Sequence, residues 1–172
     1  FSELDINKAY ALSILTDQLS FQFIKASKLR DLVYNKVDKN LFNFSYDYVG
    51  DLAETISLIW PKSIKRKSYN LAILIEKIQK LKKNEIKIEF SKILDHLSNN
   101  ERWALLKICT GGLRIGVSEK LVKTALAEQY DKGVIEIEEI WHGLKFPYDN
   151  LFRWLKNESK KPRISFKDLF HP

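Results

Sequence analysis

The chain has 172 residues, 45% of them hydrophobic and 12% aromatic, with only six glycines and four prolines. This composition supports one compact domain or two small halves that share a core, and it excludes disordered, collagen-like and low-complexity proteins. The net charge is +7, the single cysteine excludes an intramolecular disulfide framework, and no apolar run reaches the roughly 18 residues of a membrane span.

The first part of the chain is predicted to be helical. Asp5 is expected to cap the first helix, residues 38–40 resemble a turn, and Pro61 is expected to end a helix. Apolar residues that recur every three or four positions predict helices over 6–16, 21–37, 47–60 and 69–83. The alternation over residues 86–90 could form a short strand, and a helix capped by Ser91 is the competing interpretation.

The positive charge is concentrated in residues 61–92, which hold ten basic and three acidic side chains. A basic stretch of this kind is typical of proteins that bind a polyanion such as nucleic acid, or an anionic membrane surface. A solvated lysine-rich helix face is an equally weighted interpretation. Docking of the 69–83 helix on a membrane is less favoured, because a protein core explains its apolar face better.

The second part of the chain continues the helical period. Asn99 or Asn100 is expected to cap a helix that ends at Cys109 before Gly111, and Ser118 is expected to begin the next helix. Further helices are predicted over 118–130 and 136–143, and from Pro147 through Leu155. The sequence therefore predicts an all-α fold.

Two segments about 94 residues apart resemble each other. Residues 11–19 and 104–113 share a similar pattern, each follows an aromatic residue, and each precedes a long amphipathic helix. Such an echo predicts two pseudo-symmetric helical halves, with chance similarity between helical hairpins as the alternative.

The loop over residues 110–118, Thr-Gly-Gly-Leu-Arg-Ile-Gly-Val-Ser, is the most informative stretch. Its glycines expose backbone amides just before a helix N-terminus, where free N–H groups and the helix dipole favour an anion. Arg114 adds a charge, and Thr110 and Ser118 add hydroxyl donors. The loop lacks the Lys-Ser/Thr ending of a P-loop, so a mononucleotide site is not expected. A helix C-cap without a ligand and a helix-hairpin-helix element are the alternatives.

The run from Arg102 through Ala127, with residues 137–144, 147–148 and 151–155, resembles the N-terminal DNA-binding domain of ATP-dependent DNA ligases. Residues 47–55 and 58–61 are similar to the bacterial branch of that family, and the resemblance extends over about residues 5–172. It implies a multi-helix domain of two pseudo-symmetric halves over 1–160, then a linker over 161–172 that leads toward an adenylation domain.

The resemblance also implies a function. Such domains grip nicked double-stranded DNA across the minor groove through loops and helix N-termini on backbone phosphates. By position, the main contacts would come from the 110–118 loop and the helix after it, namely Thr110, Gly111, Gly112, Arg114, Gly116, Ser118, Lys120 and Lys123. Weaker candidates are Thr16, Gln18, Ser20 and Gly50, together with the basic residues Lys62, Lys65 and Arg66.

The same resemblance implies chemistry that this sequence does not contain. Such ligases adenylate the lysine of a Lys-x-Asp-Gly motif, which is absent here. We therefore expect an inactive, monomeric fragment without a cofactor of its own, while ATP, Mg²⁺, and the adenylation and OB-fold domains in cis serve the parent enzyme. The absent initiator Met agrees with a fragment, and a bacterial cytoplasmic, nucleoid-associated location is expected.

Other catalytic interpretations are weak. His96, His142 and His171 lack metal-ligand spacing with Cys109. The four tryptophans are predicted to fill the core, and Cys109 to be a small buried residue. A helical protein-interaction scaffold with a solubilising basic segment is the alternative function.

Overall fold

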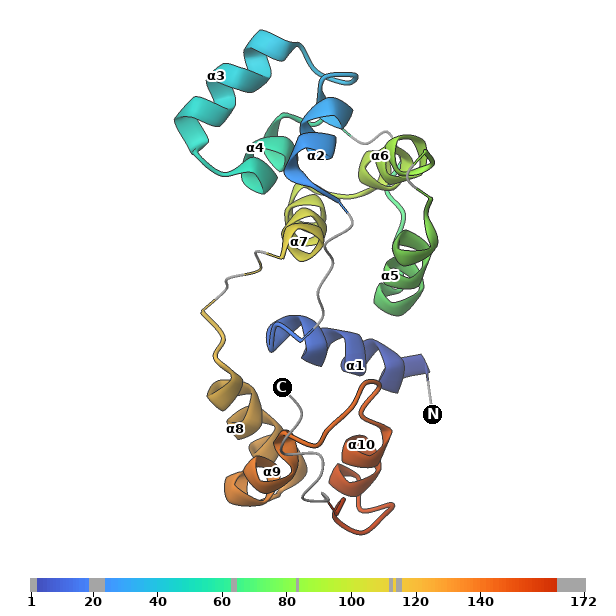
Figure 1. Cartoon of the computed structure of the whole chain (residues 1–172), viewed down its shortest axis with the longest axis vertical. Helices are drawn as coiled ribbons and strands as arrows, with labels where there is room; N and C mark the ends of the chain where they lie inside the picture. The colour runs from blue at the N-terminus through green and yellow to red at the C-terminus, as the bar shows by residue number, and fades with distance from the viewer. Residues whose placement is uncertain are drawn as a thin grey trace. The chain divides into compact units, whose positions relative to one another are not determined.

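A computed structural model describes residues 3–18, 24–62, 65–82, 84–111, 113 and 116–163 (Figure 1). The described residues form ten α-helices and contain no strand, which confirms the predicted all-α class. The helices are α1 (Glu3–Leu15), α2 (Ala26–Val33), α3 (Lys39–Val49), α4 (Leu52–Ile59), α5 (Leu71–Lys80), α6 (Ile86–His96), α7 (Asn99–Thr110), α8 (Glu119–Tyr130), α9 (Val134–Trp141) and α10 (Asp149–Leu155).

The helices divide into two compact units, and the first unit is discontinuous in sequence. Unit 1 combines residues 1–19 with 114–172, and unit 2 consists of residues 20–113. Helix α1 thus packs with α8, α9 and α10 across more than a hundred residues of chain. Its Ala9 and Leu12 join a core with Ile137, Leu151 and Trp154, all of them buried.

The core of unit 2 is built from all six of its helices. Phe42 of α3, Ile56 of α4 and Phe90 of α6 are at most 1% exposed, and Leu106 of α7 is fully buried. Each large side chain moved from water into such a core contributes about 1.5–3 kcal/mol. Helix α7 packs along α4, and this pair positions the residues discussed below.

Helix α3 corrects the prediction for residues 38–60. The polar run that resembles a turn is instead a helix start, because the Asp38 carboxylate accepts from the amides of Asn40 at 3.0 Å and Leu41 at 2.9 Å. The predicted single helix over 47–60 is wrong as well, since Gly50 ends α3 in the left-handed conformation at φ 75°. Asp51 then begins α4 as its N-cap.

Residues 86–96 form one helix, so both the strand and a helix beginning only at Ser91 are wrong. Phe90, Ile93 and Leu94 bury one face of α6 in the core, and this requirement overrides the short alternation. Helix α2 (Ala26–Val33) is shorter than the helix predicted over residues 21–37, of which residues 21–23 lie outside the described part. Helix α9 begins two residues earlier than predicted, and α10 begins at Asp149, after Pro147.

Two predicted caps are also corrected. Asp5 lies inside α1, where it is 5% exposed and its two oxygens each accept from Lys156 Nζ at 2.7 Å. Ser98, not Asn99 or Asn100, caps α7 through a reciprocal capping box with Glu101.

Cys109 is buried as predicted, and burial raises the pKa of its thiol to about 12. Trp60, Trp141 and Trp154 are buried in the two cores, and Trp103 packs against the core of unit 2.

Candidate nucleic-acid interface

The C-terminal end of α7 presents Thr110 and Gly111 on the surface of unit 2. Gly111 caps the helix at φ 70°, and its N–H is directed back to the carbonyl of Ile108. A Cβ at Gly111 would have no heavy atom within 4 Å, so the backbone conformation rather than packing requires glycine. The Thr110 hydroxyl donates to the carbonyl of Leu106 at 2.9 Å. Its oxygen lone pairs and the open space above Gly111 remain accessible.

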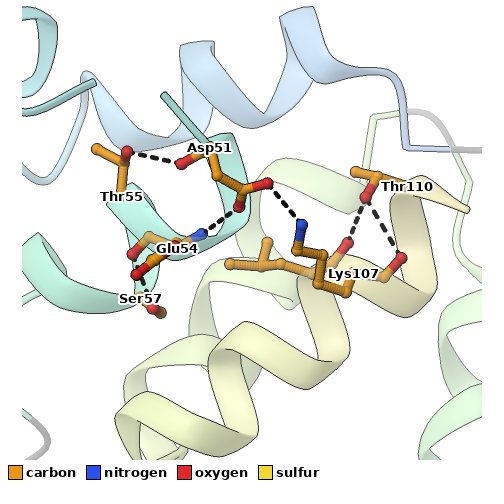
Figure 2. A network of polar contacts seen from close by, with 7 residues as sticks. Asp51, Glu54, Thr55, Ser57, Lys107 and Thr110 are labelled. Carbon is orange, nitrogen blue, oxygen red and sulfur yellow. Dashed lines mark hydrogen bonds and ion pairs between the residues drawn. The ribbon is translucent and has the colours of Figure 1, made fainter. Parts of the chain in front are cut away.

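An ion pair fixes this helix end to the corner between α3 and α4 (Figure 2). Lys107 Nζ lies 2.5 Å from Asp51 Oδ2, while Asp51 Oδ1 accepts from the amide of Glu54 at 2.8 Å. Partial burial by itself would raise the pKa of Asp51, but the hydrogen bonds from Lys107 and Glu54 outweigh it and lower the pKa. The exposed Gly50 turn and the Thr110–Gly111 end are therefore held by one carboxylate.

The end of α1 in unit 1 repeats the local geometry of the end of α7. Thr16 donates to the carbonyl of Leu12 at 2.8 Å, as Thr110, 94 positions later, does to Leu106. Asp17 follows at φ 55°, and its N–H lies 3.3 Å from the carbonyl oxygen of Ile14. The sequence echo thus corresponds to two similar helix ends, one in each unit.

The chemistry of the α1 end differs from that of the α7 end. Asp17 brings a carboxylate where the second copy has glycine, which disfavours an anion. The carbonyl oxygen of the exposed Gln18 side chain accepts from the Tyr148 hydroxyl at 2.5 Å, which leaves the side-chain NH₂ as a donor. Ser20 lies outside the described residues.

The N-terminal end of α8 supplies the remaining described positions of the predicted loop. Gly116 is exposed at φ 73°, and Ser118 caps the helix by accepting from the amide of Leu121 at 3.2 Å. Lys120 is exposed in the first turn, close to the positive end of the helix dipole. Gly112 and Arg114 lie outside the described residues. The exposed hydroxyl, the lysine and the helix end suit an anion.

Lys123 is placed differently from the other candidates. Its side chain is 4% exposed, and its Nζ lies 2.6 Å from Glu119 and 2.8 Å from Glu138, over the ring of Trp141. Burial would lower the pKa of Lys123, but the two carboxylates outweigh it and raise the pKa. Because its charge is already neutralised inside unit 1, we leave Lys123 out of the contacts proposed below.

The basic residues Lys62, Lys65 and Arg66 are exposed in the segment between α4 and α5. His96 of α6 holds this segment, because its Nδ1 bonds to the carbonyl of Lys65 at 2.8 Å and its own carbonyl accepts from the amide of Lys67 at 3.2 Å. No group of histidine, cysteine, aspartate or glutamate in the described part of the chain could hold a metal ion.

Sequence reasoning missed the ion pair between Asp51 and Lys107, although each residue alone follows a recognisable rule. An aspartate after a glycine favours an N-cap, and a lysine is favoured in the last turn of a helix. Their pairing depends on α4 lying against α7, which local patterns do not reveal.

None of the helices in the described residues is both long and apolar enough to cross a membrane.

Comparison with known proteins gives one finding. A family model described as DNA ligase N terminus matches residues 9–127, which includes most of α1, all of α2 to α7, and α8 as far as Ala127. No curated protein and no solved structure matches the chain.

Proposed function

Since the chain belongs to the DNA ligase N-terminus family, a domain of ATP-dependent DNA ligases that generally binds DNA, we propose that it grips nicked duplex DNA from the minor-groove side. In this proposal it orients the nick while an adenylation domain and an OB-fold domain in cis, with ATP and Mg²⁺, carry out sealing. The resemblance of residues 47–61 supports a bacterial enzyme that acts in replication, repair or recombination.

The observation that carries the proposal is the exposed start of α8 in unit 1. Gly116, Ser118 and Lys120 are all exposed there. The start of α8 offers the Ser118 hydroxyl, the Lys120 ammonium and first-turn amides that have no acceptor within the helix, and these donors suit phosphate oxygens. Contacts of this type carry no base readout, so we expect binding that does not depend on sequence.

No catalytic step is proposed for this chain. Its sequence contains no Lys-x-Asp-Gly motif, and Cys109 is buried with a strongly raised pKa. The role of these 172 residues is then to bind and position the substrate.

The decisive experiment measures binding of nicked duplexes of unrelated sequence by fluorescence anisotropy over a salt series. Arg114→Ala is expected to weaken all of them alike and to reduce the slope of log K against log salt by about 0.9, the value for one phosphate. Arg153→Ala is the matched control, because it removes an exposed arginine from α10, outside the predicted contacts.

Two results would contradict the proposal. A sequence-selective loss in Arg114→Ala would show that the loop reads bases. Absence of wild-type binding at low salt would instead favour a helical protein-interaction scaffold. The exposed apolar side chains on α3 and α4, Phe44 at 74%, Tyr48 at 92% and Leu58 at 56%, would then be the surface to test for a protein partner.

A further inference from the structure

A cavity of about 680 Å³ lies in unit 2 at the N-terminal end of α7. The segment after α4 lines it with Trp60, Lys62 and Arg66, and the start of α7 lines it with Ser98, Asn99 and Arg102. Among the described residues, its lining contains three cationic side chains and no carboxylate. At 1.5 Å per residue, the 12 residues of α7 separate this cavity from Thr110–Gly111 by about 18 Å.

Arg102 is a buried cation that has no carboxylate at ion-pair distance among the described residues. It is 1% exposed, and its three hydrogen bonds go to neutral oxygens: Leu94 O at 2.7 Å, Asn99 Oδ1 at 3.3 Å and Pro61 O at 3.2 Å. A guanidinium carries five N–H donors, so these bonds leave two of them free. A buried charge is expensive unless it is paired, which makes this cavity favourable for an anion.

Two carboxylates lie near the cations of the cavity. Burial is the main cause that lowers the pKa of Arg102; attraction from Asp95 opposes it, and weaker repulsion from Arg66 adds to it. Hydrogen bonds from Ser98 and, to a smaller extent, the charge of Arg66 lower the pKa of Glu101. The carboxylate of Asp95 is already engaged, because it pairs with Lys36 at 2.8 Å and accepts from Trp60 Nε1 at 3.0 Å.

The backbone holds Arg66 at this cavity. The carbonyl of Lys65 can only accept, so His96 Nδ1 carries the proton in their 2.8 Å hydrogen bond. The amide of Lys67 returns to the carbonyl of His96 at 3.2 Å. These two bonds bracket Arg66 and anchor its backbone to the last turn of α6.

The first turn of α7 adds backbone donors. The N–H groups of Asn99 and Asn100 lie at helix positions that have no acceptor within the helix, at the positive end of the dipole. The carboxylate of Glu101 is used in the capping box, where it accepts from the amide of Ser98 at 2.7 Å and from its hydroxyl at 2.6 Å. Guanidinium forks and helix N–H groups together match the oxygens of a phosphate.

We propose that this cavity is a second phosphate-binding site, separate from the 110–118 loop, and that a backbone phosphate of the DNA duplex occupies it. The choice of DNA as the source of the phosphate rests on the proposed function. Within unit 2, the separation of about 18 Å between this cavity and Gly111 is spanned by about five base pairs of duplex at 3.4 Å each.

The first test follows backbone amide resonances of the whole chain by NMR during titration with inorganic phosphate, with chloride as the reference at equal ionic strength. Phosphate is expected to shift the amides of Asn99 and Asn100. Lys62→Gln with Arg66→Gln is expected to weaken this binding about tenfold or more, because it removes two charged hydrogen-bond donors from the cavity. Both side chains are exposed, so the double variant keeps the buried Arg102 and the fold.

The matched control removes two charges from elsewhere in unit 2, with Lys80→Gln on α5 and Lys92→Gln on α6, both exposed lysines. It is expected to leave phosphate binding within about twofold, since these charges do not line the cavity. Shifts that avoid Asn99 and Asn100, or equal weakening by the two double variants, would overturn the site.

The second test measures binding of nicked duplex by the same variants over a salt series. Lys62→Gln with Arg66→Gln is expected to make the salt slope shallower by about 0.9 or more than the control does. An unchanged slope, with inorganic phosphate still bound, would overturn DNA as the source. The phosphate titration uses no DNA, so failure of the wild type to bind duplex would refute the proposed function and not the site.

Discussion

Asp51 offers a sharp test of how the α7 end is held, because one carboxylate performs two tasks. It caps α4 through the amide of Glu54 at 2.8 Å, and it pairs with Lys107 of α7 at 2.5 Å. Asp51→Asn keeps a good capping side chain and removes the charge, whereas Asp51→Ala removes both. The difference between the two variants isolates the cap.

The expected magnitudes follow from this geometry. Loss of an N-cap costs about 1 kcal/mol. The ion pair is partly solvated, with 20% of the Lys107 side chain and 36% of the Asp51 side chain exposed, so it contributes about 0.5–1 kcal/mol. We therefore expect Asp51→Asn to lower the free energy of unfolding by about 0.5–1 kcal/mol and Asp51→Ala by about 1.5–2 kcal/mol.

The pH dependence gives an independent check. The pKa of Asp51 is lowered by folding from its ordinary value of 3.8, so its charge stabilises the folded state above that value. This contribution is lost as the pH falls through the lowered pKa. The stability difference between wild type and Asp51→Asn should therefore be present at pH 7 and shrink below about pH 4.

Urea denaturation followed by circular dichroism, at pH 7 and at several values below pH 4, measures these quantities. Lys92→Gln is a control that removes a charge from an exposed pair on α6. The reasoning is refuted if Asp51→Asn is as destabilising as Asp51→Ala, or if its effect is the same at every pH.

Two further variants test the buried arginine and the left-handed glycine. Arg102→Met should lower the free energy of unfolding by about 1–2 kcal/mol, because the carbonyls of Leu94 and Pro61 lose the guanidinium while Leu94 still accepts from the amide of Leu97; a urea transition equal to that of wild type would contradict this. Gly111→Ala should cost about 1–2 kcal/mol through its positive φ alone, since its Cβ would meet nothing within 4 Å. Equal thermal stability of Gly111→Ala and wild type would show that the end of α7 changes its backbone conformation without a loss of stability.

Local rules were sufficient for much of the fold and part of the candidate site. The helical period established the all-α class, and Gly111 and Ser118 marked the end of α7 and the start of α8 as predicted. The echo over residues 11–19 and 104–113 reappears as two similar helix ends. These features depend on residues within one or two turns of each other, which a single sequence displays directly.

Local sequence rules gave wrong predictions where a short segment fits two different conformations. The Asp38 segment has the composition of a turn as well as that of a helix cap, and the alternation over residues 86–90 fits a strand until Phe90 is placed in the core. In both cases burial of apolar side chains from other helices decided between two conformations of similar local cost.

The sequence by itself therefore determined the all-α class and where the positive charge is concentrated, while the anion-binding loop over residues 110–118 stays a prediction. Only the tertiary structure decided that Lys123 is neutralised by Glu119 and Glu138, that Asp5 pairs with Lys156, and that Arg102 faces a cavity without an acid. Of these, Asp5 and Lys156 lie farthest apart, 151 residues along the chain. A charge is available to a ligand only if no neighbour neutralises it, and those neighbours are chosen by the packing of the helices.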